Sequence, residues 1–144
     1  MTDKVFVDTN IILYAEFDDD SKKYNCAKAL LKNSFIQSGV YISTQVLNEF
    51  FVNALRKGAG ASDIQSVLLN YSNNFKLITI DFQTIRECWR ILNRYHFSYW
   101  DSLIIAAALE ADCSILYSED MQDGQIIENT LTIRNPFVTQ DEAR

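Results

Sequence analysis

Short apolar runs alternate with longer segments of helical periodicity along the chain, and this alternation constrains the fold more than any other feature. Five runs rich in β-branched and aromatic residues are expected strands, at residues 4–7, 40–42, 75–80, 114–117 and 131–133. Strands that alternate with helices pair in parallel, because each crossover returns the chain to the same end of the sheet. The alternation therefore predicts an α/β protein, a three-layer α/β/α sandwich with a central parallel sheet.

Five helices are expected between these strands. Their apolar stripes run through residues 24–35, 46–55, 64–71, 85–95 and 103–109. Four of the helices are preceded by capping residues, namely Ser43 or Thr44, Ser62 (with Gln65, as in a capping box), Asp81 and Ser98. The polar residues 8–10 end the first strand, and the acidic run 18–20 is expected in a loop. The last helix is apolar on almost every side and is predicted to be the most buried.

The chain has 144 residues, of which 48% are hydrophobic and 22% charged, as in one globular domain spanning residues 1–144. Its formal net charge is −6. Proteins that hold nucleic acid only by neutralising its backbone carry basic surfaces, so this charge argues against a passive coating role. It leaves a nuclease open, because carboxylates that bind a divalent metal themselves lower the net charge.

The sequence also indicates in which cellular compartment the protein is expected. The longest apolar run, Leu103 to Leu109, is far too short to span a bilayer, and the N-terminal residues show no secretory signal. Cys26, Cys88 and Cys113 are odd in number and widely spaced, which favours reduced thiols over a disulfide framework or a zinc site. We therefore expect a cytoplasmic protein with no membrane partner.

Acidic residues stand where parallel sheets bind ligands, beyond the carboxyl ends of the strands. Asp8 directly follows the first expected strand, and Asp120 lies just past the fourth. Asp101 is in the first turn of the helix before the fourth strand, and Glu49 is on the helix after the second. If the first and fourth strands are parallel neighbours, all four carboxylates can meet at one edge of the sheet.

Four carboxylates in one pocket repel one another, and a divalent cation resolves that conflict. Mg²⁺ and Mn²⁺ prefer oxygen ligands and are commonly held by carboxylates together with substrate phosphate. Such a site can activate water and stabilise the charge that develops on a phosphate. The pattern therefore favours a hydrolase that acts on phosphodiester bonds.

Each acid also has a structural interpretation. Asp8 suits a turn. Asp101 is the third residue after Ser98, as in a capping box. Glu49 points away from the apolar stripe of its helix, and Asp120 can be a surface-loop acid.

Four motifs in this order resemble the PIN-domain nucleases, above all the VapC-type toxins of bacterial toxin–antitoxin pairs. They are Val7-Asp8-Thr9-Asn10, Leu47-Asn48-Glu49-Phe50, Tyr99-Trp100-Asp101 and Ser118-Glu119-Asp120. The resemblance runs from residue 5 to about residue 136. It implies a PIN-like fold and an endoribonuclease that needs Mg²⁺ or Mn²⁺. It also implies a homodimer that cleaves RNA and is neutralised by a cognate antitoxin protein.

The same resemblance assigns residues. Asp8, Glu49, Asp101 and Asp120 match the catalytic and metal-binding acids of the family. Ser118 matches a hydroxyl that orders water and carboxylates, and Asn10 matches a polar residue that steadies the first Asp. Asp123 stands close enough to Asp120 to replace or assist it, so the fourth acid is left open between these two.

Two other functions compete with this hypothesis. A catalytically silent PIN-like module would bind a protein or RNA partner, although the presence of all four acids argues against it. Haloacid-dehalogenase-like phosphatases need a second Asp two residues after the first, and Asn10 stands there instead. No glycine-rich phosphate loop is present, so an NTPase is not supported.

Overall fold

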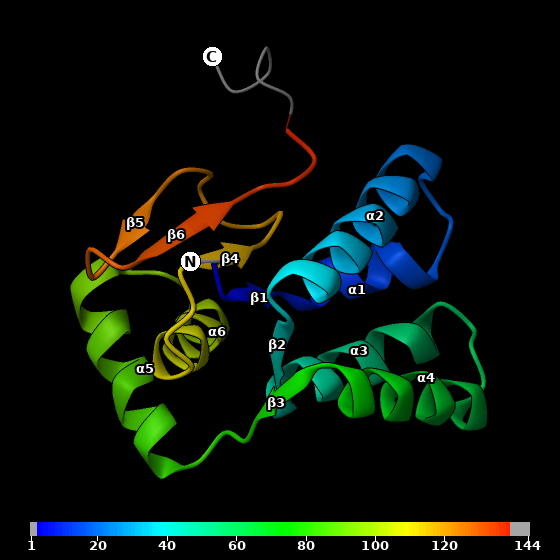
Figure 1. The fold of residues 1–144 in the computed structure, drawn as a ribbon. Coiled ribbons are helices and arrows are strands. Elements are labelled where there is room, and N and C mark those ends of the chain that lie inside the picture. Colours follow the sequence, from blue (N-terminus) through cyan, green and yellow to red (C-terminus); the bar gives the residue numbers. More distant parts are fainter. Residues whose placement is uncertain (1–2, 139–144) are drawn as a thin grey trace.

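The sheet at the centre of the molecule is described by a computed structural model that covers residues 3–138 (Figure 1). Its strands are β1 (Val5–Val7), β2 (Val40–Ser43), β3 (Lys76–Ile78), β4 (Ile115–Tyr117), β5 (Ile126–Ile127) and β6 (Leu131–Arg134). The helices are α1 (Thr9–Glu16), α2 (Ser21–Gln37), α3 (Thr44–Arg56), α4 (Ala61–Asn74), α5 (Phe82–Tyr95) and α6 (Tyr99–Glu110). All five expected strands and all five expected helices are present.

The strands are arranged in the order β3-β2-β1-β4-β6-β5. Every neighbouring pair is parallel except β5 and β6, which are antiparallel. The prediction of a parallel sheet is therefore confirmed for all strands but β5. Strand β5 was not predicted, because its two residues are too few to show a periodicity; it pairs with β6 across a turn in which Glu128 and Asn129 have positive φ.

The chain changes direction across the sheet at β1. It runs outward from β1 through β2 to β3, and then returns to place β4 on the other side of β1. In Figure 1, α1, α2, α3 and α4 lie on one side of β1 and β2, and α5 and α6 lie on the other, which confirms the layered sandwich. The carboxyl ends of β1 and β4 are thus adjacent at a topological switch point, the usual position of a ligand site in such sheets.

Helix α1 was not predicted from the sequence. It begins directly after β1, where the Asp8 side chain caps it by accepting a hydrogen bond from the Thr9 N–H at 2.7 Å. The helix has only eight residues, so its buried stripe of Ile11, Ile12 and Ala15 spans too few turns to stand out as periodic. As a result, the residues expected to end the first strand form the start of a helix that faces the edge of the sheet.

Most helix starts agree with the predicted caps. Ser43, Asp81 and Ser98 each accept a hydrogen bond from a backbone N–H in the first turn of the helix that follows. The capping box at Ser62 is wrong, because α4 begins at Ala61, two residues earlier than that cap predicts, and its cap is Gly60, which has no side chain to offer. Gly58, just after α3, takes φ of +97°, a backbone conformation that favours glycine at a helix end.

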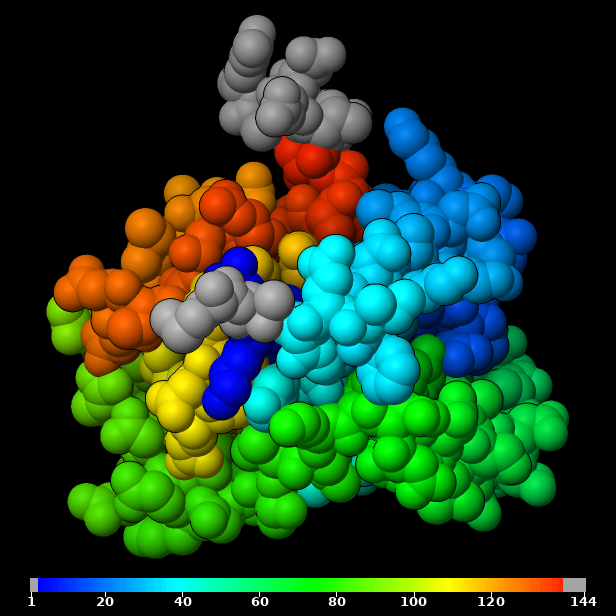
Figure 2. Space-filling view, in the orientation of Figure 1, coloured from blue at the N-terminus to red at the C-terminus, as the bar shows by residue number. Residues whose placement is uncertain are grey.

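Strands β1 and β2 are buried along their whole length, and the prediction that α6 is the most buried helix is confirmed. Residues 102–108 of α6 are all buried. Helix α2 also contacts the end of α4 at the surface, where the ring centroids of Phe35 (α2) and Phe75 (after α4) are 6.2 Å apart. Figure 2 shows the cyan and green segments that carry these residues in contact. The three cysteines are free. No helix within residues 3–138 is both long and apolar enough to cross a membrane.

Candidate active site

A cavity of about 240 Å³ lies at the carboxyl ends of β1 and β4. All four acids singled out in the sequence line it: Asp8, Glu49, Asp101 and Asp120. They come from four separate segments of the chain. Among the described residues that line the cavity there is no Lys, Arg or His, so no protein cation balances these carboxylates.

Asp8 is the most buried of the four acids, with only 5% of its surface exposed. Its Oδ1 accepts from the Thr9 N–H at 2.7 Å, and its Oδ2 accepts from the Ser118 hydroxyl at 2.8 Å. Burial raises the pKa of Asp8 to about 7, although both hydrogen bonds oppose this rise and the charges of Glu49 and Asp101 add to it. The position therefore resists a negative charge unless a cation is nearby.

Ser118 joins the two acids that follow strands. It is completely buried just after β4, donates to Asp8, and accepts from the Asp120 N–H at 3.2 Å. One hydroxyl thus fixes a carboxylate at the end of β1 and the backbone of the turn beyond β4.

Asn10 contacts Asp120 rather than Asp8, which differs from the expectation that it steadies the first Asp. Its Nδ2 donates to Asp120 Oδ2 at 3.0 Å, and its Oδ1 accepts from the Glu119 N–H at 3.4 Å. The reason is the start of α1 at Thr9: successive helical side chains diverge by about 100°, which turns Asn10 toward the loop after β4.

Glu49 and Asp101 approach the cavity from helices. Glu49 on α3 is half-buried and accepts from the Thr9 hydroxyl at 2.9 Å. Asp101 is in the first turn of α6, where its backbone N–H donates to Ser98 Oγ at 3.2 Å. Burial raises the pKa of both carboxyls, and the charge of Asp120 adds to each rise.

Asp123 lies outside the cavity. It is exposed, and its Oδ1 accepts from the Asn135 N–H at 2.8 Å. Of the two candidates for the fourth acid, the structure therefore brings only Asp120 to the other three.

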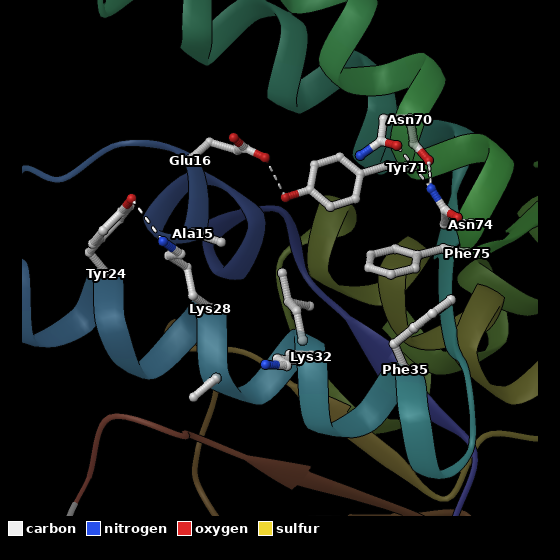
Figure 3. Close-up of a pocket in the computed structure, with 12 residues that line it drawn as sticks. Ala15, Glu16, Tyr24, Lys28, Lys32, Phe35, Asn70, Tyr71, Asn74 and Phe75 are labelled. Carbon is white, nitrogen blue, oxygen red and sulfur yellow. Dashed lines mark hydrogen bonds between the residues drawn. The ribbon is translucent and has the colours of Figure 1, made fainter.

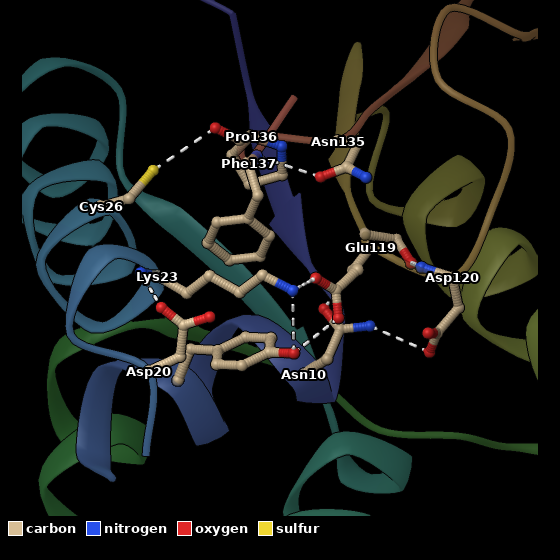
Figure 4. A network of polar contacts seen from close by, with 11 residues as sticks. Asn10, Asp20, Lys23, Cys26, Glu119, Asp120, Asn135, Pro136 and Phe137 are labelled. Carbon is tan, nitrogen blue, oxygen red and sulfur yellow. Dashed lines mark hydrogen bonds and ion pairs between the residues drawn. The ribbon is translucent and has the colours of Figure 1, made fainter. Parts of the chain in front are cut away.

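A second layer of contacts supports the turn that carries Asp120 (Figure 4). The Tyr14 hydroxyl donates to Glu119 Oε1 at 2.6 Å, and Lys23 forms an ion pair with Glu119. The ring of Phe137 packs edge-on against Tyr14 at 5.0 Å. This cluster was not predicted, because Lys22, Lys23, Lys28 and Lys32 suit either phosphate contacts or a solvated helix face equally well. In the structure, the Lys23 ammonium group pairs with the Glu119 carboxylate.

The donor set of the cavity fits a hard divalent cation, since carboxylate oxygens are the ligands that Mg²⁺ and Mn²⁺ prefer. The carboxylates are not positioned to coordinate a cation together. Within residues 3–138, no three His, Cys, Asp or Glu side chains are arranged to hold a metal ion. Glu49 is drawn toward Thr9 and Asp120 toward Asn10. Rotation of these side chains is therefore required for the carboxylates to converge.

A larger cavity of about 580 Å³ lies between α1, α2 and α4 (Figure 3). It is lined by Tyr24, Phe35 and Phe75, and its one acid, Glu16, accepts from the Tyr71 hydroxyl at 2.7 Å. Among the described residues that line it there is no carboxylate cluster, in contrast to the cavity at the sheet edge.

Comparisons with known proteins agree with this geometry. The profile of the PIN domain family matches residues 5–122, a range that contains all four acids. No curated protein sequence gives a significant match.

Solved structures share the fold. VapC20 of Mycobacterium tuberculosis, described as a sarcin-ricin loop cleaving toxin, has a TM-score of 0.68 at 18% identity over 81% of this chain and 92% of that one. A toxin–antitoxin complex from Klebsiella pneumoniae has a TM-score of 0.68 at 20% identity over 92% and 98%. VapBC2 from Rickettsia felis, bound to a DNA fragment from its promoter, has a TM-score of 0.63 at 22% identity over 91% and 97%.

Proposed function

The chain belongs to the PIN domain family, and from this premise we propose that it is an endoribonuclease that hydrolyses RNA phosphodiester bonds with Mg²⁺ or Mn²⁺. The observation that carries the proposal is that four carboxylates line one cavity whose described lining contains no Lys, Arg or His. A protein gains little from such a charge cluster unless a metal ion and a phosphate are to meet there.

Asp8, Glu49, Asp101 and Asp120 would hold the cation. When bound, it would lower the pKa of a water molecule and stabilise the charge that develops on the phosphate. Ser118 and the Thr9 N–H keep the Asp8 carboxylate in one orientation, and Asn10 holds Asp120 beside it. Thr9 also holds Glu49 at the opposite wall of the cavity. These contacts fix where a phosphate can be received before any chemistry begins.

We further propose that the protein is the cytoplasmic toxin of a type II toxin–antitoxin pair, acts as a homodimer and is neutralised by a cognate antitoxin. This is supported by structural neighbours that are toxin–antitoxin complexes. Co-expression with the adjacent open reading frame tests it, because a cognate antitoxin should co-purify with the chain. Failure of the two to co-purify would count against the pairing.

One observation favours the alternative of a catalytically silent PIN-like module. The acids of the described chain are not yet arranged to hold an ion. Direct measurement of Mn²⁺ binding separates the two functions, since a silent module has no need to bind the metal, whereas the nuclease must bind it through Asp8 and Asp101.

The decisive experiment incubates partner-free protein with total structured RNA in Mn²⁺, in Mg²⁺ and in EDTA. We expect discrete fragments that require metal and disappear in Asp8→Asn and Asp101→Asn. The matched control is Asp63→Asn, which neutralises an exposed acid in the first turn of α4, away from the cavity. Cleavage by Asp101→Asn at the rate of the parent would overturn the assignment.

A further inference from the structure

A second cavity, of about 850 Å³, adjoins the carboxylate cavity. The two cavities share three lining residues, Glu49, Asn53 and Trp100. The second cavity lies between α3 and the start of α6, so a molecule that fills it lies next to the acids. Its volume is within the range of about 300–1,000 Å³ that is typical of small-ligand sites.

The chemistry of this second cavity differs from that of the first. Among the described residues that line it, Glu49 is the one acid and Arg56 the one cation. The amide side chains of Asn48 and Asn53 line it, together with apolar groups of α3 and α6. Such walls suit a flat, neutral ring with hydrogen-bonding edges better than they suit a metal ion or a cluster of phosphates.

Trp100 stands between the two cavities with 61% of its surface exposed, although it is the residue directly before Asp101. The Tyr99 ring packs edge-on against it at 5.2 Å. A large aromatic ring exposed to water beside a charged site is unfavourable on its own, because apolar surface gains free energy when it is covered. Its exposed face is therefore available for a planar ligand to stack on.

Gln45 fixes the Trp100 backbone to α3. It lines the second cavity, is only 7% exposed, and its Nε2 donates to the Trp100 carbonyl at 3.0 Å. Within residues 3–138, Gln45 Oε1 is the one buried side-chain N or O atom without a hydrogen-bond partner. An unsatisfied buried acceptor costs about 1–3 kcal/mol. The Gln45 side chain is therefore present in the cavity wall at some cost in stability. Its amide nitrogen holds the Trp100 backbone in place.

We propose that the second cavity is a nucleobase subsite, in which one unstacked base of the RNA strand stacks on Trp100. Asn48 and Asn53 bind the edge of the base, Arg56 contacts a neighbouring phosphate, and the adjoining phosphate enters the carboxylate cavity. The inference rests on the proposed nuclease function. Stacking is the binding mode that this chain can use, because its net charge is −6 and its acids repel the RNA backbone.

The subsite requires a base that is free to leave its helix, so it predicts a preference for single-stranded loops over duplex RNA. Trp100 is also its natural reporter, because the chain has only two tryptophans, and the other, Trp89 on α5, lines neither cavity. In Trp89→Phe protein, fluorescence quenching by a bound base therefore reports on Trp100 alone.

The test measures binding of labelled hexaadenylate and hexauridylate to the full chain in EDTA, where metal-dependent cleavage is suppressed. Affinity is read from the fluorescence anisotropy of the RNA, a signal that does not depend on Trp100. We expect quenching of Trp100 by both single strands and little by a duplex of the same length. Trp100→Ala should weaken binding about tenfold or more, and Trp100→Phe should restore most of it. Asn48→Ala should change the ratio of the two affinities. Trp89→Ala removes a similarly exposed ring and should bind RNA as the parent does.

Equal RNA affinities of Trp100→Ala and parent, or no binding to the parent, would overturn the subsite. A Trp100→Ala variant that changes the sedimentation mass but not the RNA affinity would show that a second copy of the chain covers this cavity, and would also overturn it. Addition of Mn²⁺ separates the two proposals. RNA that is bound at Trp100 but never cleaved contradicts the nuclease alone, whereas RNA that Trp100→Ala binds and cleaves like the parent contradicts the subsite alone.

Discussion

The two acids that follow strands and the two that lie on helices are held in different ways, although they share one cavity. Asp8 and Asp120 are joined through Ser118, and Asn10 adds a further contact to Asp120. Glu49 is held by a single hydroxyl, that of Thr9. Asp101, on the other helix, is anchored through its backbone N–H to Ser98.

This difference divides the site into a fixed half and an adjustable half. The strand ends cannot move without disrupting the sheet, whereas a helical carboxylate can change rotamer with its backbone in place. We infer that the Asp8 carboxylate and the backbone at Asp120, both held by Ser118, define where a cation is received. Convergence of the acids then depends on rotation of the Glu49 and Asp120 side chains, which face Thr9 and Asn10. The following predictions test this division, from the largest effect to the smallest.

Asp8→Asn should abolish metal-dependent RNA cleavage, because Asp8 is the buried acid of the fixed half. The same variant should be more stable than the parent in EDTA at pH 8, since it removes a buried charge. Thermal melting measures the second effect and RNA fragmentation the first. Asp63→Asn should match the parent in both, and a fully active Asp8→Asn would contradict the role of the fixed half.

Asp8 also predicts a pH dependence in metal-free protein. Its pKa is about 7 in the folded chain against an ordinary value of 3.8 for an exposed Asp, so the folded chain binds the proton more tightly. The stability of the parent should therefore fall as the pH rises from about 4 to 7, by an amount on the order of a few kcal/mol. Melting in EDTA at pH 5, 6, 7 and 8 checks this, and the slope should be smaller in Asp8→Asn. Identical slopes in the two proteins would contradict the assignment of the proton to Asp8.

Ser118→Ala should weaken the fixed half without removing an acid. Loss of this buried hydroxyl should destabilise the protein by about 1–3 kcal/mol and weaken Mn²⁺ binding about 10- to 100-fold. Denaturant melts and calorimetric Mn²⁺ titration measure the two effects. Ser114→Ala is the control, because its hydroxyl contacts the exposed Asp3, before β4, and should leave Mn²⁺ affinity unchanged.

Thr9→Val should act on the adjustable half and have a smaller effect. It keeps the shape of the side chain but removes the hydroxyl that donates to Glu49. Because Glu49 is half-exposed, water can replace this bond, so the loss of stability should be about 1 kcal/mol or less. Mn²⁺ titration should show a smaller loss of affinity than for Ser118→Ala. Thr9→Ser should behave like the parent, and an effect as large as that of Ser118→Ala would contradict the division.

Lys23→Met should have the smallest effect, because it removes an ion pair that is partly exposed and outside the cavity. Such pairs contribute about 0–1 kcal/mol and are screened by salt. Melting at low and high salt measures the difference between variant and parent, which should shrink as salt is added. Lys28→Met, in which a lysine beside Tyr24 is lost, is the control. A salt-independent loss would point to packing against Tyr14 and Phe137 instead.

Local sequence patterns were enough to predict the parallel sheet, the most buried helix and the edge of the sheet at which the acids gather. These features follow from local patterns: strand and helix periods are visible over five to ten residues, and a residue directly after a strand must lie at its carboxyl end. The four motifs around Asp8, Glu49, Asp101 and Asp120 also pointed to the PIN domain family, which the family profile confirms.

Only the tertiary structure decided the contacts between segments far apart in the chain. Asn10 and Asp120 meet across 110 positions, and the proximity that selects Asp120 over Asp123 arises from the folding of the turn after β4. Helix α1 and the cavity beside Trp100 were likewise not predicted. The physical reason is that a side chain's partner depends on where other elements pack, whereas local periodicity reports only which face of its own element it occupies.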